Sequence, residues 1–279
     1  MDVSWVDNLS ARLPLHGGLV RALRDAIADD DRWRWFDVAC SIGAGGGDAL
    51  SDIDAAAGYA DMLDVDEASA LARELVTGVG EAVDVLVHAM EGWPPDLRRV
   101  AVDYTSGVQL DLVVMPAPQM SGLRDREVGI VDKDGDLSGN AISQLYGPPD
   151  VDVALEWTMT AWWWVSDIGK YLQRDSPFEA AERIALVRNE ALKLFAAAHD
   201  VPYPGFGLTS LLDYEPFALP PKLTDTYPAP TDRASLIAAS RNVAELLEEC
   251  VDLAARHLGY DLSTEWKTTA RRRLEAATL

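Results

Sequence analysis

A run of glycines between two apolar segments constrains this chain more than any other feature. Residues 33–40 are aromatic and β-branched, which predicts a strand, and this strand leads straight into the glycines. An Asp-Ile-Asp sequence then begins a second apolar segment, which predicts another strand over 53–59. The run therefore predicts a strand, a tight loop and a second strand. The glycines of this loop are Gly43, Gly45, Gly46 and Gly47.

Two carboxylates follow the loop, on one side of the second predicted strand. Asp52 and Asp54 are two residues apart, so their side chains point the same way while Ile53 points into the core. Paired carboxylates attract divalent cations, and glycine amides in a tight loop let phosphate oxygens approach closely. Nucleotidyl transfer needs both features. Residues 41–54 therefore predict a site for a nucleoside triphosphate such as ATP, with two Mg2+ ions.

A third carboxylate stands in a later apolar segment. Asp111 lies between Leu110 and Leu112, where an unpaired charge would be costly to bury and coordination to a metal would remove the cost. We expect Asp111 to be the third metal ligand or the general base for an attacking hydroxyl. The alternative interpretation is an exposed position or a strand end.

Residues 41–54 are similar to the signature of the polymerase-β-like nucleotidyltransferase superfamily, in its small bacterial aminoglycoside-type branch. Members carry Gly-Ser, a small glycine-containing loop and then Ser-Asp-hydrophobic-Asp. The matching positions here are Ser41, Gly45, Ser51, Asp52 and Asp54. The resemblance implies that the two aspartates bind metal, that Asp111 is the third carboxylate, and that Ser41 helps to hold the triphosphate. The pattern departs at Cys40, which replaces the family's glycine and would crowd the triphosphate.

The first half of the chain mixes predicted helices and strands. Apolar spacing predicts helices over 7–28, with an interruption at Pro14 and Gly17-Gly18, and over 67–90. A β-hairpin is predicted from 99–104 and 108–114, and a short strand over 127–131.

The second half is predicted to be helical, with long helices over 153–174, 177–199 and 232–258. We place the boundary near 146–149. The expected fold is α+β: a nucleotidyltransferase domain over 1–147, with a small mixed sheet and flanking helices, then an α-helical bundle over 148–279. The resemblance extends weakly into this half and implies that it faces the acceptor.

Two basic residues of the second half are candidate phosphate ligands. Lys170 and Arg174 are four residues apart and share a helical face. The competing interpretation is a solvated basic face. The nearby Trp162–Trp164 run spreads around the helix, so we expect two of the three rings to pack in the core.

Charge and composition narrow the partners. The chain has 24 Lys and Arg against 46 Asp and Glu, a net charge of −22, so its field repels duplex nucleic acid. A cationic small molecule, or a nucleotide with its magnesium, suits that field. Two cysteines, no signal-peptide pattern and no long apolar run predict a cytoplasmic protein without a membrane partner. Monomer and homodimer both remain open.

These features together predict transfer of AMP from ATP onto a hydroxyl of a small acceptor, and the resemblance implies an aminoglycoside-like one. Two alternatives remain. The first is a protein of this fold with little turnover that acts as an antitoxin-like binding partner, which Cys40 favours. The second is an enzyme that nucleotidylates a protein hydroxyl. A Walker-type loop is excluded because no Gly-Lys-Ser or Gly-Lys-Thr follows the glycines. A dinucleotide-binding loop is excluded because the glycines lead into a strand.

Overall fold

The computed structural model describes residues 3–90, 93–120, 122–124, 126–139, 149–213, 218–229, 232–261 and 264–278. The chain divides into two compact units, Met1–Ile142 and Ser143–Leu279. The boundary expected between 147 and 148 lies outside the described residues. The fold class is α+β, as the sequence predicts: a mixed sheet with helices in the first unit and helices in the second.

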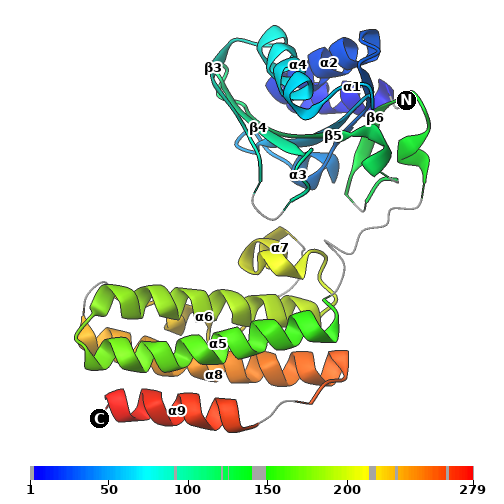
Figure 1. Cartoon of the computed structure of the whole chain (residues 1–279). Helices are drawn as coiled ribbons and strands as arrows, with labels where there is room; N and C mark the ends of the chain where they lie inside the picture. The colour runs from blue at the N-terminus through cyan, green and yellow to red at the C-terminus, as the bar shows by residue number, and fades with distance from the viewer. Residues whose placement is uncertain are drawn as a thin grey trace. The chain divides into compact units, whose positions relative to one another are not determined.

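The first unit is built on a six-stranded sheet in the order β3-β4-β5-β2-β1-β6 (Figure 1). Strands β2 and β5 are parallel and the other neighbours are antiparallel, so the sheet is mixed. The strands are β1 Trp33–Val38, β2 Ile53–Tyr59, β3 Ala82–His88, β4 Arg98–Tyr104, β5 Gln109–Pro116 and β6 Val128–Asp132. The predicted hairpin and the predicted strand over 53–59 are confirmed.

Helices α1, α2 and α4 cover one face of this sheet (Figure 1). Their bounds are α1 Val3–Arg12, α2 Pro14–Asp29 and α4 Val65–Gly78, and the short α3 is Cys40–Gly43. The predicted interruption is confirmed at Pro14, where α2 begins after α1 has ended at Arg12, but it is wrong at Gly17-Gly18, because α2 runs through these glycines. A Cβ on Gly17 would lie 2.3 Å from the Cα of Ser10, so this glycine lets α1 and α2 pack closely.

The helix predicted over 67–90 is also wrong in its second half. Helix α4 ends at Gly78, and β3 follows and pairs antiparallel with β4. The valines of β3 recur at every second residue, which is the strand period, whereas the alanine and leucine of α4 follow the helical period. A capping box between Asp64 and Glu67 fixes where α4 begins.

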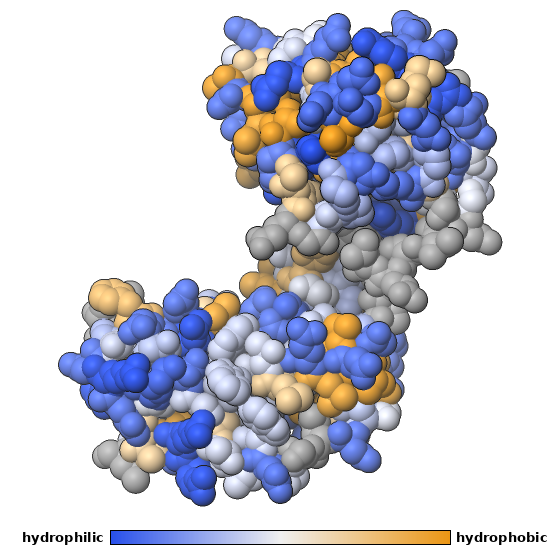
Figure 2. Space-filling view, viewed as in Figure 1, coloured by the Kyte–Doolittle hydropathy of each residue, from blue (hydrophilic) through white to orange (hydrophobic). Residues whose placement is uncertain are grey.

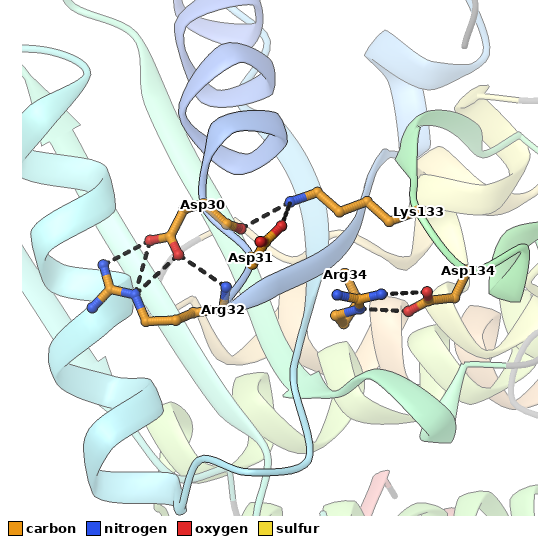
Figure 3. Close-up of polar contacts among 6 residues, drawn as sticks. All are labelled: Asp30, Asp31, Arg32, Arg34, Lys133 and Asp134. Carbon is orange, nitrogen blue, oxygen red and sulfur yellow. Dashed lines mark hydrogen bonds and ion pairs between the residues drawn. The ribbon is translucent and has the colours of Figure 1, made fainter.

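Charged side chains hold the start of β1 to the turn that follows β6 (Figure 3). We call Asp30, Asp31, Arg32, Arg34, Lys133 and Asp134 the paired cluster. Arg34 forms a bidentate ion pair with Asp134, Arg32 binds Asp30 at 2.6 Å, and Lys133 Nζ lies 3.8 Å from Asp31. Asp132 accepts hydrogen bonds from the amides of Gly135 and Leu137, and these bonds close the turn after β6.

The second unit consists of long helices that lie side by side (Figure 1). Its helices are α5 Val151–Gln173, α6 Pro177–Ala198, α7 Leu208–Asp213, α8 Arg233–Leu258 and α9 Thr264–Thr278. The three predicted helices correspond to α5, α6 and α8. Trp162 is buried and Trp164 packs partly against the core, while 58% of Trp163 is exposed, so two of the three rings contribute to the core as expected.

Hydrophilic residues cover most of the visible face of each unit, with smaller apolar areas between them (Figure 2). Among the described residues, every helix is too short or too polar to cross a membrane.

Candidate functional site

The glycine-rich segment joins β1 to β2 through the four-residue helix α3. Cys40, the first residue of α3, has a φ of +53°, in the left-handed region that favours glycine. The amide of Ala39 donates to the carbonyl of Asp54 at 2.8 Å, which fastens the beginning of the loop to the beginning of β2. Cys40, which stands where the nucleotidyltransferase signature has a glycine, therefore has a backbone conformation that favours glycine.

Three of the four loop glycines have a structural requirement. Gly45 has a φ of +80°. A Cβ on Gly43 would lie 2.5 Å from the carbonyl oxygen of Arg126, and one on Gly47 would lie 2.4 Å from the Cδ1 of Ile42. At Gly46 the nearest atom to such a Cβ is 3.9 Å away. Close packing thus accounts for the glycines at 43 and 47, and the positive φ accounts for the glycine at 45.

The amides of these glycines donate to carbonyl oxygens of the same segment. Gly46 and Gly47 both donate to the carbonyl of Ser41, at 3.0 and 2.9 Å, and Gly43 and Gly45 donate to other carbonyls nearby. Triphosphate binding by the four amides stays a prediction, and it requires these bonds to open. The amides of Ser41 and Ile42, in the first turn of the four-residue α3, have no acceptor within the helix.

The predicted carboxylates come together on neighbouring strands. Asp54 of β2 pairs directly with Asp111 of β5 in the parallel register, and the exposed Asp52 immediately precedes β2. We call Asp52, Asp54 and Asp111 the acid triad. Burial and then the charge of Asp52 raise the pKa of Asp54 to about 6, with a further contribution from Asp111.

Arg99 of β4 binds the third member of the triad. Its Nε and Nη2 donate to the two carboxylate oxygens of Asp111 at 2.8 and 2.6 Å. The pair is half-buried, with 41% of the Arg99 side chain and 24% of the Asp111 side chain exposed. The hydrogen bond and charge of Asp111, followed by Asp54 and Asp52, raise the pKa of Arg99. Arg99 therefore contacts Asp111 and interacts with Asp54 and Asp52 through charge alone.

The chemistry of the acid triad fits Mg2+, which prefers carboxylate oxygens. Burial and then the charge of Asp52 disfavour the ionised form of Asp54, and a bound divalent cation would favour that form. Within the described residues, no group of three or more His, Cys, Asp or Glu side chains is arranged to hold a metal ion. Asp111 faces Arg99 instead, so complete coordination requires that pair to separate.

Cys40 contributes a thiol to the site. It donates a hydrogen bond to the carboxylate of Asp54, which lowers the pKa of that acid in part. Burial, the charge of Asp54 and this hydrogen bond raise the pKa of the thiol to about 12. Cys40 therefore acts at neutral pH as a neutral donor to Asp54.

Two residues of the first helices also reach the loop. Arg12 donates from Nη1 to the carbonyl of Gly45, and the buried His16 contacts the carbonyl of Ser51 through Nε2 at 2.8 Å. The hydroxyl of Ser51 accepts from the amide of Asp48 at 3.0 Å, which closes the turn before Asp52. Ser51 thus shapes the turn and its carbonyl is held from α2.

A further carboxyl lies on the same side of the sheet as Asp54. Asp37 of β1 pairs with Ala56, two residues beyond Asp54, and accepts its amide at 3.1 Å. Asp37 is 1% exposed, and its Oδ2 has no hydrogen-bond partner among the described residues. Burial and then the charge of Glu127 raise its pKa to about 8.

The two predicted basic residues belong to the second unit. Lys170 Nζ binds Asp167 at 2.6 Å, and the hydrogen bond raises the pKa of this lysine. Arg174 follows the last residue of α5 and is exposed. Their contact with phosphate stays a prediction.

Sequence reasoning missed Arg12, His16, Asp37 and Arg99. Each lies near the site only because distant segments of the chain come together in the fold, and none belongs to the glycine motif. The one available signal was Asp37, a charged residue within the aromatic run 33–38, where burial of a charge needs an explanation.

No protein-family model matches the chain, and no curated protein matches its sequence. Among solved structures, the chain is similar to an aminoglycoside 6-adenyltransferase from Bacillus subtilis, with 16% identity, a TM-score of 0.45, and coverage of 93% of this chain and 97% of that chain. A similarity at this level leaves the function to be decided by the residues of the site.

Proposed function

We propose that this chain is a magnesium-dependent nucleotidyltransferase that moves AMP from ATP onto a hydroxyl of a small acceptor. The observation that supports this most is the register of β2 and β5, which brings Asp54 beside Asp111 although 57 residues separate them in the sequence. Asp52 adds a third carboxylate at the start of β2. A glycine-rich loop that begins with Ser41 leads into this acid triad.

Each side chain then has a part in the reaction. Asp52 and Asp54 hold Mg2+, which neutralises charge as the α-phosphate is attacked. Asp111 either joins them as a ligand or accepts the proton of the attacking hydroxyl. Ser41 and the amides of residues 43–47 bind triphosphate oxygens once the hydrogen bonds within the loop open. Pyrophosphate leaves as the new phosphoester forms.

We propose an aminoglycoside-like polycation as the acceptor class. The net charge of −22 supports it, because a strongly acidic protein attracts polycations over a distance and raises their local concentration. Such acceptors also carry many hydroxyl groups. We propose the second unit as the acceptor side, with Lys170 and Arg174 available to phosphate groups.

The test is incubation of the pure chain with ATP labelled at the α-phosphate, Mg2+ and a set of aminoglycosides. We expect a labelled small product, and we expect Asp52→Ala to lower its formation by about a thousandfold or more, since metal stabilisation contributes several kcal/mol. The matched control is Asp103→Asn, an exposed carboxylate on β4 that should leave transfer unchanged. Full activity in Asp52→Ala would contradict the metal assignment.

The same experiment separates the alternatives. Label on the protein itself would support an enzyme that nucleotidylates protein hydroxyls. Binding of ATP without any transfer would support the antitoxin-like partner, which the left-handed Cys40 favours. In that case Cys40→Gly should restore transfer, because glycine adopts the backbone conformation without strain and removes the side chain. Cys40→Ala, which keeps the strain, is the control.

A further inference from the structure

The ion pair between Arg99 and Asp111 leads to an inference that rests on the proposed function and deepens it. Arg99 lies diagonally across the β4–β5 pair from Asp111, since the register places Arg99 opposite Val113 and Asp111 opposite Ala101. Long side chains reach such diagonal neighbours. The contact uses both oxygens of the carboxylate, at 2.8 and 2.6 Å. Asp111 in this state offers its oxygens to a guanidinium.

The acid triad carries more negative charge than Arg99 can balance. With all three acids ionised, one guanidinium balances one of three negative charges. Asp111 is the acid that Arg99 binds directly, whereas Asp54 and Asp52 interact with Arg99 only through their charge. Two excess charges at Asp52 and Asp54 match one divalent cation. The pair at Asp111 is already neutral.

A metal ion that needs Asp111 must therefore compete with Arg99. Once displaced, the guanidinium carries a full charge beside the bound metal and requires a new anion. The phosphate oxygens of a nucleoside triphosphate are such an anion, and arginine binds them in the same bidentate way as a carboxylate. The arrival of the triphosphate would thus compensate for the separation of the pair.

We propose that Arg99 is a counter-ion switch: it holds Asp111 until a metal-bound triphosphate arrives, and then it binds a phosphate of that nucleotide. Arg99 makes metal binding at Asp111 conditional on nucleotide. The site takes one divalent cation at Asp52 and Asp54 without nucleotide, and it uses Asp111 only when the triphosphate is present. Premature filling of the whole site by metal is prevented by a residue of the chain.

The test is Mn2+ binding to the full chain, measured by electron paramagnetic resonance with and without an ATP analogue whose α,β bridge resists transfer. We expect Arg99→Gln to bind Mn2+ roughly three- to tenfold more tightly than wild type without nucleotide, the range for loss of one partly exposed charge partner. We expect its affinity for the analogue to fall by a similar factor. Arg99→Lys keeps the charge and loses the bidentate geometry. Its affinities for Mn2+ and for the analogue should lie between those of wild type and those of Arg99→Gln.

The matched control is Arg98→Gln. Arg98 is the neighbouring residue of β4, its Nη1 binds the carbonyls of Pro95 and Leu97, and its removal changes the net charge equally. Arg98→Gln should bind Mn2+ as wild type does. Circular dichroism of each variant confirms that it is folded. A merely structural Arg99 would leave Mn2+ affinity unchanged in the folded variant, and that result would overturn the proposal.

The outcomes also separate this inference from the proposed function. If wild type binds Mn2+ but transfers no label, the activity is wrong while the comparison of Arg99→Gln with wild type still decides the switch. If wild type binds no Mn2+ without nucleotide and Arg99→Gln does, Arg99 competes with the metal for the whole acid triad, and the separate cation at Asp52 and Asp54 is wrong. If neither protein binds Mn2+ with or without the analogue, both ideas fail. Equal or weaker Mn2+ binding by Arg99→Gln without nucleotide rejects the switch alone.

Discussion

The first unit contains two clusters of three acids each, and they are compensated in opposite ways. In the paired cluster each acid faces its own cation: Asp30 faces Arg32, Asp31 faces Lys133 and Asp134 faces Arg34 (Figure 3). In the acid triad, three carboxylates share Arg99. The pKa values follow the difference. Hydrogen bonds from arginine hold the pKa values of Asp30 and Asp134 below their ordinary value, whereas the pKa of Asp54 is raised to about 6.

The difference shows how a structural group of charges and a candidate binding group can be told apart in an acidic protein. The paired cluster fastens β1 to the turn after β6, and its ions are satisfied within the chain. The acid triad holds like charges close together on adjacent strands at an energetic cost. An added cation should therefore matter at the triad and leave the paired cluster unaffected.

The largest expected effect is stabilisation by divalent metal. At a Mg2+ concentration a hundredfold above its Kd, we expect the free energy of unfolding to rise by about 2.7 kcal/mol, since the folded chain alone presents the site. Asp54→Asn should remove this gain and Asp134→Asn should keep it. Thermal unfolding with and without Mg2+ checks both variants. Equal loss of the gain in the two would contradict the division between the clusters.

A second effect concerns Asp37, a buried acid that differs from both clusters. Its pKa is about 8 in the folded chain and 3.8 ordinarily, so the folded chain retains a proton that the unfolded chain releases. The contribution of Asp37 to stability is fully present below about pH 4 and is lost as the pH rises through about 8. Asp37→Asn mimics the protonated acid. We expect it to raise the free energy of unfolding by roughly 1–3 kcal/mol at pH 8.5 and to change it little at pH 4.

Urea denaturation at both pH values measures the effect of Asp37→Asn. Asp103→Asn, an exposed acid on β4 bound by the amide of Gln109, is the matched control and should show no such pH dependence. A parallel shift of the two variants at pH 8.5 would show that Asp37 titrates as an ordinary surface acid. That result would show that Asp37 does not differ in its titration from an exposed acid.

The sequence predicted one part of this arrangement and missed another, for physical reasons. Residues 41–59 carry local information: turn-forming glycines, alternation at Ile53, and a strand whose predicted bounds are those of β2. Pairing of Asp111 with Asp54, or of Arg99 with Asp111, depends on strand register, which distant segments fix together. The misassigned β3 is a different case, because its valines already alternate with the strand period in the sequence.

Three helices of the second unit, α5, α6 and α8, were predicted to within two residues at each end, whereas α7 and α9 were not predicted. The function of this unit was less predictable than its long helices. Long apolar periodicity determines α5, α6 and α8 almost to the residue. The roles of Lys170 and Arg174 depend on which ligand they meet, and Lys170 already has Asp167 as a partner. The periodicity of apolar residues carries no information about which ligand a helix binds. Predicting a ligand requires a local motif such as the glycine-rich segment of the first unit.

The smallest expected effect concerns the paired cluster itself. Asp134→Asn removes a carboxylate that is 43% exposed and pairs with Arg34, so we expect a small loss in the free energy of unfolding at low salt. At about 1 M salt the Debye length is near 3 Å, and the loss should largely disappear. The loss of Mg2+ stabilisation in Asp54→Asn should persist at a fixed excess of Mg2+ over its Kd. Urea denaturation in low and high salt therefore distinguishes a cluster that is compensated within the chain from one that awaits a cation.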